Sequence, residues 1–119
     1  MSKGVLNSKS YAFALDVIRF YKFLTSEKRE FVLSRQLLRS GTAIGALIRE
    51  AEHAQSRKDF LNKINISLKE ANETEYWIDL LKDSELILLE EYADISQKIK
   101  EILRLLISTV KTTKQNLDR

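Results

Sequence analysis

The residues that come nearest to a reactive pattern are Glu50 and His53, spaced as Glu-x-x-His. Carboxylate-bridged di-metal bundles use such a pair on each of two helices and a further glutamate on each of the other two. His53 is the only histidine and cysteine is absent, so a second pair cannot be completed. The chain also carries no nucleophile elbow and no recognisable triad or acid–base pair. We therefore expect a protein without enzymatic activity, metal, cofactor or small-molecule substrate.

A second group of polar residues combines carboxylates with hydroxyls and a cation. Glu70, Glu73 and Trp77 follow at i, i+3 and i+7 on one helical face, with Thr74 beside them. Buried carboxylates need hydrogen-bond donors or a cation nearby, and an earlier segment of the chain offers both. We interpret the set as a structural polar network that fixes the register of the helices. Its predicted members are Arg39, Ser40, Thr42, Glu50, Glu70, Glu73 and Thr74.

Two glycines lie four residues apart, at Gly41 and Gly45, inside a segment that otherwise favours a helix. Each glycine costs a helix roughly 1 kcal/mol relative to alanine. Close approach of another helix, or of a bulky side chain such as Trp77, would compensate for this cost. A phosphate-binding loop is the alternative, but the preceding strand and the Gly-Lys-Ser/Thr ending are missing. We predict close helix packing at Gly41, Gly45 and Trp77.

These residues must be positioned by helices. The chain has 119 residues, of which 44% are hydrophobic and 31% charged, as is typical of one globular domain, here residues 1–119. Proline is absent and only three glycines occur, so strands and tight turns lack their usual residues. Ser56 and Asp59 form the capping pattern of a helix start. Apolar residues of the last segment repeat with helical spacing: Tyr92, Ile95, Ile99, Leu103, Leu106 and Val110.

Polar stretches supply the remaining breaks between helices. The pattern predicts helices over about residues 8–25, 30–54, 56–82 and 89–114. Long helices joined by short connections favour an all-α, antiparallel, up-and-down four-helix bundle. The longest apolar run, residues 43–48, is far shorter than the roughly 20 residues of a membrane span. Because no secretory hydrophobic region follows the N-terminus either, we expect a cytoplasmic protein with no membrane partner.

The first predicted helix carries aromatic residues on more than one face. Its expected core stripe is Ala14, Val17, Ile18, Tyr21 and Leu24, whereas three phenylalanines project from a different side. Large exposed aromatic patches are uncommon on monomers and mark partner surfaces. We predict that Phe13, Phe20 and Phe23 form an oligomer interface; the alternative is that their rings cover an edge of the bundle.

Positive charge is concentrated in the first half of the chain. The net charge is +6 over residues 1–58, −4 over residues 59–85 and +1 over residues 86–119, which leaves +3 in total. Without an evident aromatic stacking platform, we expect contact with a phosphate backbone rather than strong sequence readout. The candidate residues for binding RNA or DNA are Lys9, Arg19, Lys22, Lys28, Arg29, Arg57 and Lys58.

Several motifs also resemble a known family. The run over residues 34–46, SRQLLRSGTAIGA, is followed by Glu50-Ala51, by Lys58-Asp59-Phe60 and by LKEANETEYW over residues 68–77. Together these closely resemble the bacterial four helix bundle proteins encoded in intervening sequences of large-subunit ribosomal RNA genes. The positions that match the signature, which we interpret as structural, are Arg39, Ser40, Gly41, Gly45, Glu50, Glu70, Glu73, Thr74 and Trp77.

The resemblance implies an up-and-down bundle that assembles into a homopentameric ring. It also implies a likeness to the accessory proteins of diversity-generating retroelements, which are basic barrels associated with nucleic acid and a reverse transcriptase. Five copies of a +3 chain would carry +15. We therefore expect a non-enzymatic homo-oligomer that binds RNA or DNA through a basic surface or scaffolds a nucleic-acid enzyme. The alternative is a protein–protein interaction scaffold with no role in nucleic-acid binding.

Overall fold

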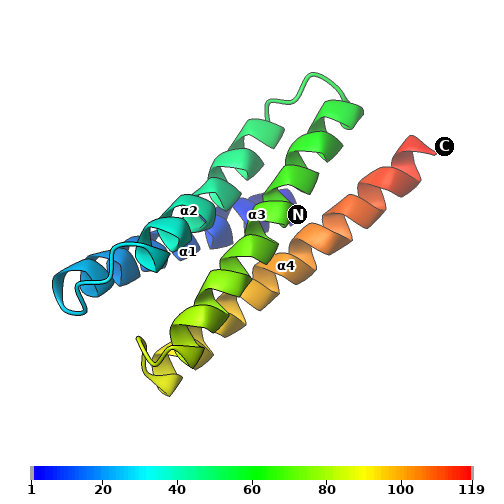
Figure 1. Ribbon diagram of the computed structural model, residues 1–119. Helices are drawn as coiled ribbons and strands as arrows, with labels where there is room; N and C mark the ends of the chain where they lie inside the picture. Colours follow the sequence, from blue (N-terminus) through cyan, green and yellow to red (C-terminus); the bar gives the residue numbers. More distant parts are fainter. Residues whose placement is uncertain (1, 119) are drawn as a thin grey trace.

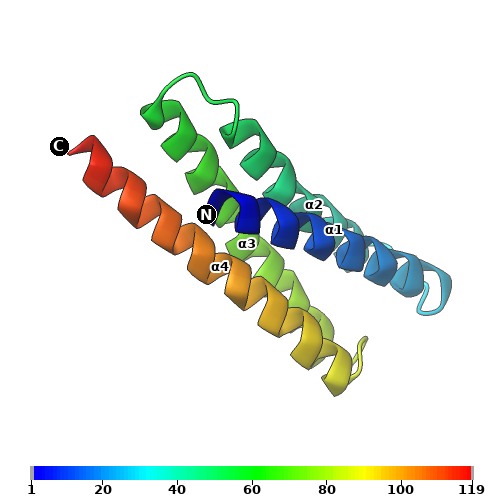
Figure 2. The same cartoon turned by 180° about the vertical axis from the view of Figure 1, so that it is seen from behind.

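Four helices make up the computed structural model, which describes residues 2–118. They are α1 (Ser2–Ser26), α2 (Leu33–Ala51), α3 (Arg57–Asp83) and α4 (Leu89–Leu117). Helices that follow one another in the chain pack side by side in opposite directions, and α4 returns to lie against α1 (Figures 1 and 2). The predicted all-α, up-and-down four-helix bundle is confirmed. Of the predicted domain 1–119, Met1 and Arg119 lie outside the described residues, and assembly into a ring stays a prediction.

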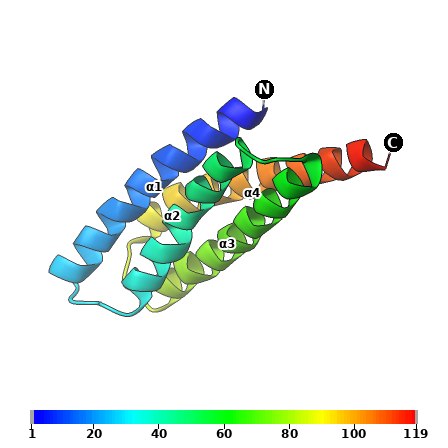
Figure 3. The same cartoon turned by 90° about the horizontal axis from the view of Figure 1, so that it is seen from above.

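The turns divide the bundle into two ends. The turns between α1 and α2 and between α3 and α4 lie at the end drawn lower in Figure 1, which we call the lower end. The turn between α2 and α3 lies at the opposite, upper end, where α1 begins and α4 finishes. Seen from above, these last two segments diverge (Figure 3). Among residues 2–118, no helix combines the length and apolar character needed to cross a membrane.

Local side chains determine where α2 and α3 begin. Glu30 accepts hydrogen bonds from the backbone N–H groups of Val32, Leu33 and Ser34, so α2 begins at Leu33 and not at the predicted residue 30. Partial burial raises the pKa of the Glu30 carboxyl, but the hydrogen bonds from Leu33, Ser34 and Val32 together bring it below its ordinary value. The predicted cap of α3 is confirmed, because Ser56 Oγ accepts a hydrogen bond of 3.0 Å from the N–H of Asp59.

The core runs along the inside of all four helices. Five of the six residues in the predicted stripe of α4 are buried, and the sixth, Tyr92, is partly buried against them. The α1 helix starts earlier than predicted, at Ser2, and its Leu6 is buried. The buried core side chains of largest size are Leu6, Phe13, Leu24, Leu37, Ile44, Ile48, Ile64, Ile78, Leu81, Ile95, Ile99 and Ile102.

The predicted surface role of Phe13 is wrong. Its side chain is 1% exposed, because α1 packs against α4 as well as α2. Of the expected stripe, Val17 and Leu24 are fully buried, as predicted. Ala14, Ile18 and Tyr21 of that expected stripe are only partly buried. Phe20 and Phe23 pack against the core at the edge of the bundle and stay partly exposed, as the alternative interpretation described. Their part in an oligomer interface stays a prediction.

The two helical glycines lie where α1 crosses α2. A Cβ atom at Gly41 would lie 2.8 Å from Cγ2 of Val17, and one at Gly45 would lie 3.2 Å from Oγ of Ser10. The predicted close packing is therefore confirmed for both glycines. The expected role of Trp77 is wrong, because the atoms that face the glycines belong to α1.

Candidate nucleic-acid interface

The candidate basic residues fall into three separate groups. Lys28 and Arg29 precede α2 and lie at the lower end, whereas Arg57 and Lys58 follow α2 and lie at the upper end. The 19 residues of α2 separate these two pairs by about 28 Å at 1.5 Å per residue. Lys9, Arg19 and Lys22 belong to α1 between the two ends. The predicted set therefore does not form one compact surface.

Two of the residues on α1 already have acidic partners. Lys9 Nζ lies 3.1 Å from Oε2 of Glu101, and Arg19 pairs with Asp16. Lys98 of α4 joins the same face, with Nζ 2.8 Å from Oδ2 of Asp16. Hydrogen bonds to Asp16 and Asp94 raise the pKa of the Lys98 ammonium above its ordinary value. The charges of this face are locally compensated, which makes it a poor site for a polyanion.

The upper end gathers basic side chains from two helices. Arg57 and Lys58 lie in the first turn of α3, and the antiparallel packing places this turn beside the last turns of α4 (Figures 1 and 3). Those turns carry Lys111 and Lys114, which the sequence analysis did not single out because the net charge of residues 86–119 is only +1. We call these four residues the upper basic cluster. All four are exposed, and none forms an ion pair within the described part of the chain.

Acidic side chains near the upper basic cluster mostly have other partners. Asp59 Oδ2 accepts a hydrogen bond of 3.2 Å from the N–H of Gln55, and Glu52 Oε2 accepts one of 2.8 Å from Asn7. Asp118, which caps α4, is the exposed carboxylate nearest in sequence to Lys114. The upper end therefore keeps an excess of positive charge that could contact phosphates.

The predicted polar network forms in part between α2 and α3. The guanidinium of Arg39 pairs with Glu73 and with Glu70, the latter at 3.3 Å between Nη1 and Oε1. The indole N–H of Trp77 donates a hydrogen bond of 3.1 Å to Glu73. The Thr74 hydroxyl lies 2.9 Å from that of Ser40, and both residues are fully buried.

Two predicted members lie outside this network. Thr42 donates to the carbonyl oxygen of Leu38 within α2, and Glu50 lies 3.8 Å from Nζ of Lys63. Ser67 is a further contact between the two helices that no sequence pattern indicated: its buried hydroxyl donates a hydrogen bond of 3.0 Å to the carbonyl oxygen of Ile44. The contacts that join the two helices, from Thr74 to Ser40 and from Ser67 to Ile44, fix the register of α2 against α3.

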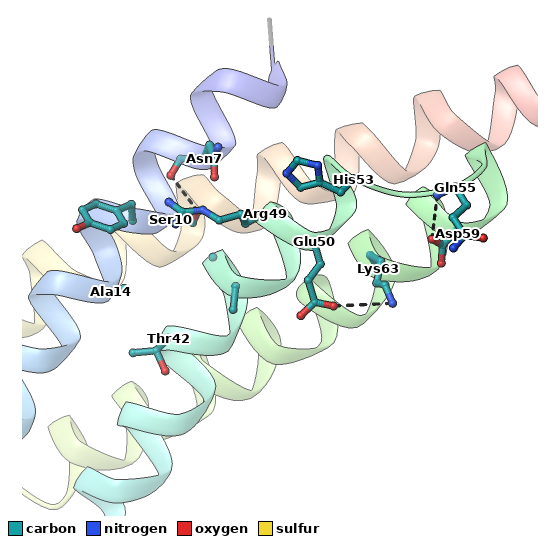
Figure 4. A pocket seen from close by; sticks show the side chains of 13 residues that line it. Asn7, Ser10, Ala14, Thr42, Arg49, Glu50, His53, Gln55, Asp59 and Lys63 are labelled. Atoms are coloured by element: carbon teal, nitrogen blue, oxygen red, sulfur yellow. Dashed lines mark hydrogen bonds and ion pairs between the residues drawn. The ribbon is translucent and has the colours of Figure 1, made fainter.

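A groove of about 710 Å³ runs over the outer side of α2, between α1 and α3 (Figure 4). Its walls mix both signs of charge, with Arg49 and Lys63 opposed by Glu50 and Asp59. Figure 4 shows the Glu50 side chain directed toward Lys63 rather than toward His53. Among the described residues, no three acidic, histidine or cysteine side chains are grouped as metal ligands. The groove thus presents neither a metal centre nor an excess of positive charge.

This bundle is similar to proteins of a known family. Residues 5–108 match the profile of the family described as 23S rRNA-intervening sequence protein. The chain belongs to that family. It is also similar to the crystal structure of a protein of unknown function from the S23 ribosomal protein family of Bacteroides thetaiotaomicron. The two are 57% identical, with a TM-score of 0.92 over 93% of this chain and 99% of the other. A comparison with curated proteins found no match.

The resemblance inferred from the motifs is thus confirmed for the 23S rRNA-intervening sequence protein family, whereas the relation to retroelement accessory proteins stays a prediction. The span that matches the family profile contains Arg57 and Lys58 and ends before Lys111 and Lys114. Half of the upper basic cluster therefore lies within the family span, and half lies on the part of α4 that extends beyond it.

Proposed function

We propose that this chain is a non-enzymatic, homo-oligomeric RNA-binding protein whose upper basic cluster contacts the phosphate backbone. The observation that supports the proposal most directly is that the adjacent ends of α3 and α4 carry four exposed cations without ion-pair partners in the described residues: Arg57, Lys58, Lys111 and Lys114. The name of the family, which refers to 23S ribosomal RNA, makes RNA the first nucleic acid to test.

The physical basis is the release of counterions. Cations that neutralise phosphates free the condensed counterions of the polyanion, which favours binding and makes the affinity depend steeply on salt. No aromatic side chain belongs to the cluster, so contact with phosphates should exceed readout of bases. Repetition of the cluster in a homo-oligomer would raise the affinity for a long RNA through multivalency, without any new type of contact.

A salt titration with a labelled, mixed-sequence, single-stranded RNA tests the proposal. If each bound copy neutralises four phosphates, the slope of log K against log salt is about −3, from about −0.7 per phosphate. Replacing all four cluster residues with glutamine should abolish most of the binding at low salt. Binding of wild-type protein that is undetectable even at low salt would contradict the proposal and favour the protein–protein scaffold. Tighter binding to DNA than to RNA would redirect the proposal to DNA.

A matched control separates this site from general charge effects. Lys9, Lys63, Lys98 and Lys100 each form an ion pair, so their replacement with glutamine removes the same net charge from other surfaces. We expect this control variant to keep most of the wild-type affinity. Equal losses in both variants would show that the net charge of the chain, and not the upper basic cluster, determines binding.

A further inference from the structure

The two turns at the lower end of the bundle carry opposite charges. Residues 19–35, which connect the end of α1 to the start of α2, include five basic and two acidic side chains. Residues 79–94, which connect α3 to α4, include six acidic side chains and one basic side chain. We call these segments the basic turn and the acidic turn. They lie at the same end of the bundle (Figures 1 and 3).

Most cations of the basic turn remain available to a partner. Only Arg19 forms an ion pair among the described residues, so Lys22, Lys28, Arg29 and Arg35 have none. The carboxylate of Glu30 accepts hydrogen bonds from the backbone N–H groups at the start of α2 and forms no ion pair with these four cations.

The basic turn also exposes apolar surface. The side chain of Phe31 is 48% exposed and that of Val32 is 70% exposed. The Arg29 guanidinium lies 5.9 Å from the centre of the Phe31 ring, so a cation and an aromatic ring are presented together.

The acidic turn has the matching composition. Leu88 is 62% exposed and Leu89 is 75% exposed, which makes them the counterparts of Phe31 and Val32. Glu85 and Glu90 are exposed and form no ion pair within the described residues. Each turn therefore combines two exposed apolar side chains with an excess of unpaired charge of one sign, and in the basic turn four unpaired cations outnumber the exposed carboxylate of Glu27.

The two turns do not satisfy each other within one chain. No ion pair of the described residues joins segment 19–35 to segment 79–94. Apolar side chains surrounded by charged ones are typical of protein interfaces, and complementary charge directs which surfaces meet. An RNA strand would match only the basic turn and would be repelled by the carboxylates at the same end. A second copy of this chain matches both.

We infer that the basic turn of one copy docks against the acidic turn of the next copy. This names the interface of the homo-oligomer proposed above and does not depend on RNA binding. Because the two surfaces differ, the contact can repeat head to tail, and an open assembly keeps one free basic turn and one free acidic turn at its two ends until it closes into a ring. Both turns lie at the lower end, so closure gathers the lower ends and leaves the upper basic clusters free for RNA.

Charge reversal tests the docking, with light scattering after size exclusion as the measurement and no RNA present. The double variants Lys28→Glu/Arg35→Glu and Glu85→Lys/Glu90→Lys each reverse one turn. Each variant alone should fall from the oligomer mass to the 13.8 kDa of a single chain. A chain that carries all four substitutions should regain the oligomer mass, because the attraction is restored with its sign exchanged. Wild-type assembly should also weaken as salt rises, because salt screens exposed charges.

A charge-matched variant elsewhere on the bundle serves as the control for the docking experiment. The variant Lys69→Glu/Arg104→Glu lowers the net charge as much as the basic-turn variant does, on exposed parts of α3 and α4, and should keep the oligomer mass. Far-UV circular dichroism verifies that each variant is folded. A monomeric wild type, reversal variants of unchanged mass, or a four-substitution chain that stays monomeric would each overturn the inference. A basic-turn variant that keeps its mass but loses RNA affinity would assign that turn to RNA. The glutamine variant of the upper basic cluster tests RNA binding separately.

Discussion

The contact between Gly41 and Val17 offers a quantitative test of how α1 meets α2. Replacing Gly41 with alanine should gain about 1 kcal/mol of helix propensity. The new Cβ atom would lie 2.8 Å from Cγ2 and 3.0 Å from Cγ1 of Val17, a β-branched side chain that cannot easily move aside. Overpacking of this kind costs about 1–3 kcal/mol. We therefore expect Gly41→Ala to lower the free energy of unfolding by about 1 kcal/mol overall.

The same substitution should have the opposite sign when Val17 is shortened. Val17→Ala alone removes two buried methyl groups and should cost about 2 kcal/mol. In that background only the Cβ atom of residue 17 remains near the new Cβ atom, at 3.3 Å, and the two closer methyl contacts are gone. Gly41→Ala should then stabilise the protein by about 1 kcal/mol, a coupling energy of about 2 kcal/mol.

Urea unfolding followed by circular dichroism measures all four proteins of this cycle. A fixed protein concentration is required, because assembly adds to apparent stability. Gly45→Ala is the matched control: its Cβ atom would lie 3.2 Å from Oγ of Ser10, so its effect should be smaller and insensitive to Val17. The reasoning would be refuted by equal effects of Gly41→Ala in both backgrounds, or by a full gain of stability in the wild type.

Two further substitutions test the cap of α2 and the corrected position of Phe13. Glu30→Gln should lower the free energy of unfolding by about 1 kcal/mol near pH 7, through the loss of a charged cap. The pKa of Glu30 is lowered in the folded chain, so its contribution is present above the unfolded pKa and disappears as the pH falls through the folded pKa. Urea midpoints of the two proteins should therefore converge as the pH falls from the ordinary pKa of a glutamate through the lowered pKa of Glu30, and a constant difference would contradict the assigned cap. Phe13→Ala should cost about 3–5 kcal/mol because it empties a core site. A variant with wild-type urea stability but reduced oligomer mass would instead return Phe13 to an interface.

The sequence by itself determined the local elements. Without proline, and with apolar residues at helical spacing, the chain has no regular alternative to helices, and Ser56 with Asp59 marks the start of α3 through groups a few residues apart. Gly41 and Gly45 likewise indicate a close approach, since their cost to a helix needs compensation. These are properties of neighbours in the chain, so periodicity and residue type suffice to predict them.

Only the tertiary structure decided which residues meet across helices. The stripe that α1 buries depends on its packing against α2 and α4 together, which is why Phe13 is in the core. The charge of Lys9 is compensated by Glu101, a residue distant in the chain, whereas Lys111 and Lys114 lie at the same end of the bundle as Arg57 because α3 and α4 run antiparallel. Burial and charge compensation depend on the relative register of separate helices. That register is fixed by contacts such as Thr74 with Ser40: the sequence indicated both residues as polar network members, but only the packing of α2 on α3 decides that these two hydroxyls pair while Thr42 bonds within α2.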